Sequence, residues 1–86
     1  MKIIKISTVW CPSCLVMNPR YKEIKDRYPN IEFVSLDLDL DEEAKEYNVG
    51  SILPVFILFN DEEIEVERLI GEHKTKELIS IIEKHL

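Results

Sequence analysis

The stretch "STVWCPSCLVMNP", from Ser7 to Pro19, contains both cysteines of the chain, Cys11 and Cys14, separated by two residues. It overlaps the end of the short β-branched segment "KIIKIS" (2–7), which predicts a strand. A helix is predicted to begin immediately after Cys11. The cysteine pair therefore lies where a strand passes into a helix.

The predicted helix starts at Pro12, because proline is tolerated in a first turn, where its missing N–H leaves no helical bond unmade. Pro19 lies inside the helix and predicts a kink, and "YPN" (28–30) predicts the end of the helix. Apolar side chains recur at steps of three and four and form one helical face: Cys14, Met17, Tyr21, Ile24 and Tyr28.

The middle of the chain predicts two strands with a short helix between them. Residues 31–39 alternate well enough for a strand, and 54–60 form a nearly continuous apolar run, which is typical of a strand buried on both faces. Residues 41–49 predict the helix, with Asp41 as its cap and Gly50 as its stop.

The last part of the chain predicts a strand and a helix. After a turn at 61–62, residues 63–70 alternate charged and apolar side chains and predict an edge strand with one solvated face. Residues 74–86, after Gly71, predict an amphipathic helix, whose buried stripe consists of Leu78, Ile79, Ile82 and Leu86. The element order is βαβαββα, and the first two strands should be parallel, with a right-handed crossover.

Length and composition predict one domain over residues 1–86. A hydrophobic fraction of 45% supplies a core that does not depend on a metal or a disulfide. A bridge between Cys11 and Cys14 would close only a small loop, and loop entropy rewards long loops. A purely structural bridge is therefore a weak explanation of the pair.

The net charge of −6 argues against a nucleic-acid partner and against docking on an anionic membrane. No apolar run approaches the ~20 residues of a membrane-spanning helix. The start of the chain, "MKIIKIS", lacks the apolar stretch of a signal peptide. We therefore expect a cytoplasmic protein whose thiols are kept reduced.

A C-x-x-C pair between a strand and a helix is a specific context for redox chemistry. Cys11 is expected to be exposed at the helix N-terminus, where unpaired N–H groups and the helix dipole favour a thiolate. Cys14, one turn later, faces the core and is placed to resolve a mixed disulfide formed at Cys11. Pro12 stiffens the turn between them.

"WCPSC", with Pro19 five residues after the second cysteine, resembles the thioredoxin-like superfamily, and the resemblance extends over nearly the whole chain. "SILPVFILF" resembles the family's cis-proline loop and central strand, and the chain has the length of a glutaredoxin. The resemblance implies a three-layer α/β/α sandwich with a mixed four-stranded sheet of order 2-1-3-4. The first and third helices would cover one face and the second helix the other.

The resemblance also implies a role for each matching residue. Cys11 would be the nucleophile and Cys14 the resolving thiol. Pro54 would be cis and lie opposite the pair, and the backbone of Leu53 would dock an extended substrate segment. Trp10 would shield the disulfide. No bound cofactor is implied.

Several positions depart from the family pattern. Thioredoxins carry a buried aspartate in the first strand, where this chain has Lys5, and a lysine in the next strand, where it has Ser35. Glutaredoxins carry a cation where this chain has Thr8, and a Gly-Gly-x-Asp stretch where "GEHK" follows the last strand. Our hypothesis for Lys5 is that its ammonium lies near the thiols, favours the thiolate and makes the pair more oxidising. The competing interpretation is that Lys5 extends to water from the end of the strand.

The predicted function is dithiol–disulfide exchange on protein substrates by a monomeric reductant, which a flavoprotein reductase or another thiol pool recharges. An oxidase or isomerase would use the same residues. A metal or iron–sulfur protein and a binding module with incidental thiols also stay open. Zinc needs four ligands, and the only further His or Cys candidates are His73 and His85. "DLDLDEE" (37–43) lacks the glycine and glutamate of a calcium loop.

Overall fold

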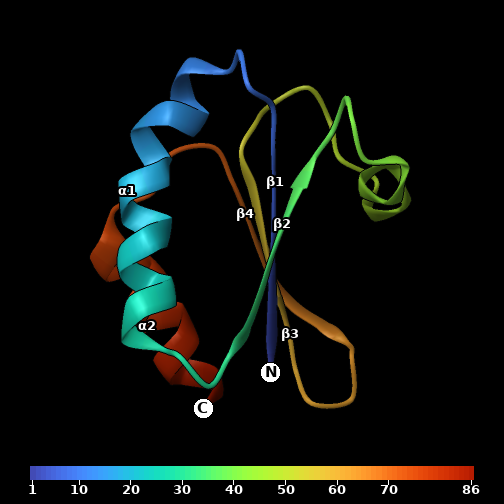
Figure 1. Ribbon diagram of the computed structural model, residues 1–86. Helices are drawn as coiled ribbons and strands as arrows, with labels where there is room; N and C mark the ends of the chain where they lie inside the picture. The colour runs from blue at the N-terminus through green and yellow to red at the C-terminus, as the bar shows by residue number, and fades with distance from the viewer.

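The computed structural model describes residues 1–86 and has three layers (Figure 1). Helices α1 and α2 cover one face of a four-stranded sheet, and a 3₁₀ helix, η1, lies on the other, as predicted. The elements are β1 (Lys2–Ser7), α1 (Pro12–Arg27), β2 (Glu32–Asp37), η1 (Glu42–Tyr47), β3 (Val55–Phe59), β4 (Glu65–Ile70) and α2 (Thr75–His85). No helix combines the length and apolar character needed to cross a membrane.

The sheet has the predicted order β2-β1-β3-β4. β1 pairs in parallel with β2 and antiparallel with β3, and β3 pairs antiparallel with β4. Lys5, near the middle of β1, therefore lies between Ser35 of β2 and Phe56 of β3.

Each face of the sheet packs against its own apolar cluster. Side chains of β1 and β3 alternate between the two faces, since successive residues of a strand point to opposite sides. The cluster under the two long helices consists of Ile3, Met17, Tyr21, Ile24, Phe56, Leu58, Leu78 and Ile82. The cluster under η1 consists of Ile4, Ile6, Leu36, Ala44, Val55 and Ile57.

Helix α1 has the predicted start and end. Cys11 is its N-cap, and Pro12 occupies the first helical position. The helix continues through Pro19 and ends at Tyr28, whose backbone N–H donates to the Ile24 carbonyl. The predicted face is buried at Cys14, Met17, Tyr21 and Ile24.

The middle helix differs from its prediction in type and in its stop, while Asp41 is its N-cap residue as predicted. It is a 3₁₀ helix of six residues. The Asp41 side chain makes no capping hydrogen bond, and its carboxylate instead accepts one from the backbone N–H of Asp37 at 2.8 Å. Asn48, with φ +53°, takes the left-handed position that ends the helix, so Gly50 is not its stop.

The last strand and the last helix differ from their predictions at their ends. β4 begins at Glu65 because Glu63, with φ +61°, belongs to the preceding turn. The strand shows no clean alternation, since its residues from Val66 to Leu69 are all half-buried. Leu86 lies beyond the end of α2 and is exposed, so the predicted buried stripe does not reach it.

Candidate active site

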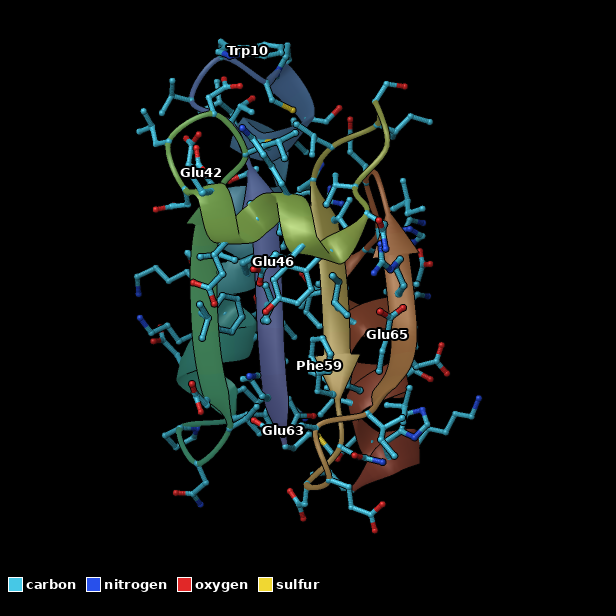
Figure 2. The ribbon with its side chains drawn as sticks, turned by 90° about the vertical axis from the view of Figure 1, so that its right-hand side faces the viewer. Trp10, Glu42, Glu46, Phe59, Glu63 and Glu65 are labelled. Atoms are coloured by element: carbon cyan, nitrogen blue, oxygen red, sulfur yellow. The ribbon has the colours of Figure 1, made fainter.

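Four connecting segments meet at one end of the sheet. β1, β2 and β4 run in the same direction and end there, while β3 runs the other way and begins there. The segments are residues 8–11, 38–41, 50–54 and 71–74. Trp10 lies at this end and Glu63 at the opposite one (Figure 2). The cysteine pair therefore lies where several loops can contribute side chains.

Cys11 is held by two contacts. Its Sγ accepts a hydrogen bond from the backbone N–H of Cys14 at 3.2 Å, and its thiol donates to the Leu53 carbonyl at 3.8 Å. Only 7% of Cys11 is exposed. The prediction of an exposed sulfur is therefore wrong, because the first turn of α1 and the Leu53 carbonyl lie against it.

Cys14 lies deeper, with 2% of its surface exposed. Burial raises the pKa of its thiol to about 11, and the hydrogen bond with the Cys11 side chain adds to the rise. Both cysteines are free thiols. The two sulfurs thus belong to one turn of helix but have different surroundings.

The residues around Cys11 form an apolar rim. Trp10 is 69% exposed, and its indole Nε1–H donates to the Asp39 carboxylate at 2.8 Å. Val9 and Ile52 are also largely exposed, and so is half of Ile70. This rim borders a sulfur that is itself nearly covered.

The segment opposite the cysteines contains Leu53 and Pro54. The peptide bond between them is cis. The Gly71 N–H donates to the Pro54 carbonyl at 2.8 Å, and Gly71 has φ +85°, which glycine adopts without a steric cost. The residues after β4 are thereby fixed beside this segment.

Lys5 lies on the α1 side of the sheet. Its Nζ lies 5.6 Å from the centroid of the Tyr21 ring. Burial lowers the pKa of the Lys5 ammonium, and the nearby Cys14 thiol opposes that shift. Burial, with a further contribution from both thiols, raises the pKa of Tyr21, whose hydroxyl has no hydrogen-bond partner. The apolar layer under α1 thus contains a small cluster of three ionisable side chains, those of Lys5, Tyr21 and Cys14.

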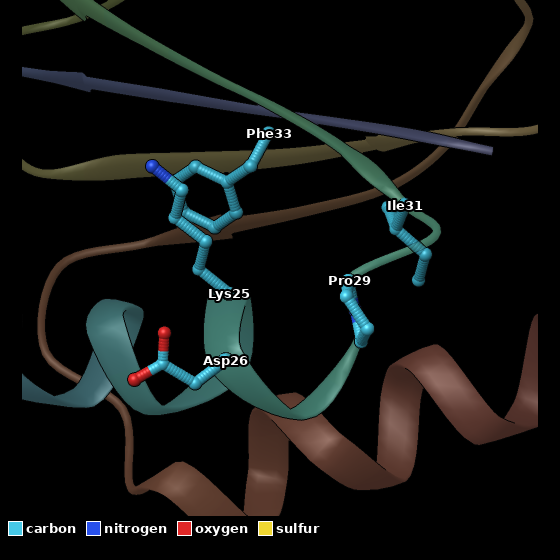
Figure 3. A pocket seen from close by; sticks show the side chains of 5 residues that line it. All are labelled: Lys25, Asp26, Pro29, Ile31 and Phe33. Carbon is cyan, nitrogen blue, oxygen red and sulfur yellow. The ribbon is translucent and has the colours of Figure 1, made fainter.

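Three hollows mark the surface, and none is lined by either cysteine. The hollow between the end of α1 and β2 is lined by Lys25, Asp26, Pro29, Ile31 and Phe33 (Figure 3). A neighbouring hollow of about 280 Å³ shares two of these residues and reaches Lys5 and Tyr21.

The residues considered for metals are engaged in other contacts. His73 contacts Glu77, and His85 contacts Glu67. The carboxylate of Asp37 accepts hydrogen bonds from the backbone of the turn that follows it. No three metal-binding side chains come together in the chain.

Two contacts at the site were not predicted. Ser13 Oγ donates to Glu72 Oε2 at 2.8 Å, and Trp10 donates to Asp39. The partners are 59 and 29 residues apart, so no local pattern links them. The only sequence signal for Glu72 is its place directly after Gly71.

A C-x-x-C pair capping a helix, beside a cis-proline segment on a mixed four-stranded sheet, defines a thioredoxin-type fold and site. The Thioredoxin family model matches residues 1–84, and the chain belongs to the thioredoxin family. It is 33% identical over 80 residues to thioredoxin H-type of Fagopyrum esculentum, covering 92% of this chain and 67% of that protein. It is 35% identical over 75 residues to thioredoxin-2 of Pyricularia oryzae, covering 86% of this chain and 43% of that protein.

Solved structures agree with the fold. The thioredoxin of Fasciola hepatica has a TM-score of 0.86 at 28% identity, covering 99% of this chain and 80% of that chain. Mitochondrial thioredoxin 3 of Saccharomyces cerevisiae has a TM-score of 0.83 at 28% identity, covering 96% and 76%. The chain spans about half the length of several of the curated relatives that it matches.

Proposed function

We propose that this protein reduces disulfides of other proteins by dithiol–disulfide exchange, with Cys11 as nucleophile and Cys14 as resolving thiol. The observation that carries the proposal is the contact between the two cysteines. The Cys11 sulfur lies 3.2 Å from the backbone nitrogen of Cys14, in the first turn of α1, while Cys14 is buried behind it.

The first step takes place at Cys11. Its thiolate attacks one sulfur of the substrate disulfide, a new S–S bond joins substrate and protein, and the other substrate sulfur leaves as a thiolate that takes up a proton. In the resting protein the thiol faces the Leu53 carbonyl. A substrate segment that binds to the backbone of Leu53 therefore takes over a contact that the thiol makes when no substrate is bound.

The second step releases the substrate. Cys14 loses its proton and attacks the Cys11 sulfur, and the bond to the substrate breaks. The second substrate sulfur leaves as a thiolate and takes up a proton, so the substrate is reduced by two electrons in all. The protein keeps a Cys11–Cys14 disulfide. Because the Cys14 pKa is about 11, the positive charge of Lys5 favours this step by stabilising the Cys14 thiolate.

The remaining site residues hold the substrate. Trp10 presents an exposed ring beside Cys11, and Pro12 fixes the start of the helix. Leu53 and Pro54 offer backbone to an extended segment, a common mode of peptide recognition. The enzyme acts as a monomer in a reducing, cytoplasmic setting, and a reductase of the thioredoxin-reductase type or another thiol donor restores the dithiol.

Two single substitutions test the proposal. Cys11→Ser should abolish reduction of a protein disulfide such as that of insulin, because no attacking sulfur remains. Cys14→Ser should still attack but should stall as a mixed disulfide, detectable as a mass increase that a reducing agent removes. An adduct on the Cys11→Ser protein, or full activity of either variant, would refute the assignment.

Lys5 supports a second candidate, an oxidase or isomerase with the same cysteines. A cation near the pair stabilises the reduced form and so raises the reduction potential. The potential of the pair against a thioredoxin standard separates the candidates. A value near that of thioredoxin supports the reductant, and a clearly higher value supports the oxidase or isomerase.

A further inference from the structure

Two carboxylates lie at the rim of the site without a cationic partner. Asp39 accepts from Trp10, and Glu72 accepts from Ser13. Neither takes part in an ion pair, whereas the carboxylates of Asp26, Glu65 and several others do. These two carboxylates therefore have no ion-pair partner within the protein.

Glu72 lies between the two segments that border the reactive sulfur. It follows Gly71, which is bonded to the Pro54 carbonyl, and its Oε2 accepts from Ser13 inside the C-x-x-C turn. The side chain is exposed, and its second oxygen, Oε1, has no partner in the protein. One carboxylate oxygen is thus fixed to the site while the other remains available.

No nearby cation forms an ion pair with Glu72. The imidazole of His73 contacts Glu77 and the Ile70 carbonyl, and the Arg20 guanidinium donates to the His73 carbonyl at 2.7 Å. Lys74, the N-cap residue of α2, is likewise in no ion pair. The rim therefore combines exposed apolar side chains with a carboxylate that no cation of the protein pairs with.

We propose that Glu72 selects protein disulfides in which the attacked cysteine has a lysine or arginine next to it. The inference rests on the proposed function, because it concerns the substrate that Cys11 attacks. The apolar rim binds the body of the segment without regard to charge, and Glu72 distinguishes among segments by their charge. Charge complementarity of this kind acts on the association rate and weakens as salt increases.

The experiment uses three peptides that carry the same cysteine in a mixed disulfide with one small neutral thiol. The three peptides differ only at one residue next to the cysteine, which is lysine in the first, glutamine in the second and glutamate in the third. The reduced protein attacks each peptide, and rapid mixing gives the second-order rate constants at low and at high salt. The same rates with dithiothreitol correct for the effect of the neighbour on the disulfide itself.

After that correction, the lysine peptide should react about tenfold faster than the glutamate peptide at low salt, and the ratio should shrink at high salt. Glu72→Gln keeps an acceptor for Ser13 and removes the charge, so it should lower the ratio about threefold. Glu83→Gln, the same change on the exposed side of α2, should leave the ratio as it is.

The outcomes separate this inference from the function on which it rests. If Glu72→Gln leaves the corrected ratio unchanged, or if the wild-type ratio equals that of dithiothreitol, Glu72 does not select by charge. If the glutamine peptide reacts no faster with the wild-type protein than with Cys11→Ser, the exchange function itself fails.

Discussion

The two faces of the sheet are both apolar, but they differ in the size of their clusters and in the ionisable side chains that they hold. The face under α1 and α2 carries the larger cluster and also holds Cys14, Lys5 and the hydroxyl of Tyr21. The face under η1 carries a smaller cluster with no ionisable side chain among its fully buried members. Polar groups of the site thus lie within the better-covered face, where each one costs more to bury.

The comparison explains why a small protein can hold a lysine in such a layer. Two long helices bury enough apolar surface to offset the burial of one ammonium. The short helix η1 buries less apolar surface on its side of the sheet, so less free energy is available there to offset the burial of a charge. The polar residues of the candidate site therefore lie on the face with the larger apolar cluster.

The largest expected effect comes from two neighbours on β3 that point to opposite faces. Ile57 and Leu58 are both fully buried, one in each cluster. Leu58→Ala should cost about 4 kcal/mol of unfolding free energy, because two helices fix the cavity. Ile57→Ala should cost about 2 kcal/mol, because the single short helix η1 can settle into the space.

Chemical denaturation of the two variants measures this difference. Equal costs, or a larger cost at Ile57, would mean that the two faces are packed equally firmly.

The next effect concerns the titrating group of the α1 side. Cys14 has a pKa of about 11 in the folded protein, against about 8.5 unfolded. A raised folded pKa means that the contribution to stability is complete below pH 8.5 and is lost as pH rises to 11. Relative to Cys14→Ser, the wild-type protein should lose about 1 to 2 kcal/mol of stability over that range.

Urea unfolding at several pH values follows this loss, and taking the difference between the two proteins removes the contributions of groups that do not interact with Cys14. A constant difference between the proteins would show that Cys14 does not titrate in a buried place.

How much of this arrangement the sequence predicts depends on the range of the interaction. The periodic faces of α1 and α2 and the apolar run of β3 predict the layers, since such patterns reflect burial along one element. The C-x-x-C spacing predicts which helix end carries the site. The contacts of Ser13 with Glu72 and of Trp10 with Asp39 depend on how loops from different strands meet, which no local pattern encodes. The contact of Cys11 with the Leu53 carbonyl, which helps to cover its sulfur, depends on the same kind of long-range meeting of loops.

The smallest effect compares two lysines of β1. Lys5 faces α1, while Lys2 faces the η1 side, with its Nζ 5.6 Å from the Phe59 ring and 3.7 Å from a Glu63 oxygen. Lys5→Met should stabilise the protein by about 1 kcal/mol at pH 7, because it removes a partly desolvated charge that solvent screens only in part. Lys2→Met should bring no gain.

The melting temperature of Lys5→Met should rise by about 4–8 °C, while release of substrate from the mixed disulfide should slow. Lower stability of Lys5→Met would show that the folded protein stabilises the Lys5 ammonium. An unchanged rate of substrate release would show that Lys5 has no role in the exchange reaction.

Pro19 has one further consequence for the helix that carries the cysteines. Without an N–H, it cannot supply the donor that a regular helix gives to the Leu15 carbonyl, and Leu15 is 64% exposed. The first turns of α1 are therefore connected to the later turns, which include the buried Ile24, by one backbone hydrogen bond fewer than in a regular helix. Amide hydrogens ahead of Pro19 should exchange sooner than those behind it. In the proposed exchange, a first part of α1 that moves independently of Ile24 would let the Cys11 and Cys14 sulfurs approach and separate while the rest of the fold stays in place.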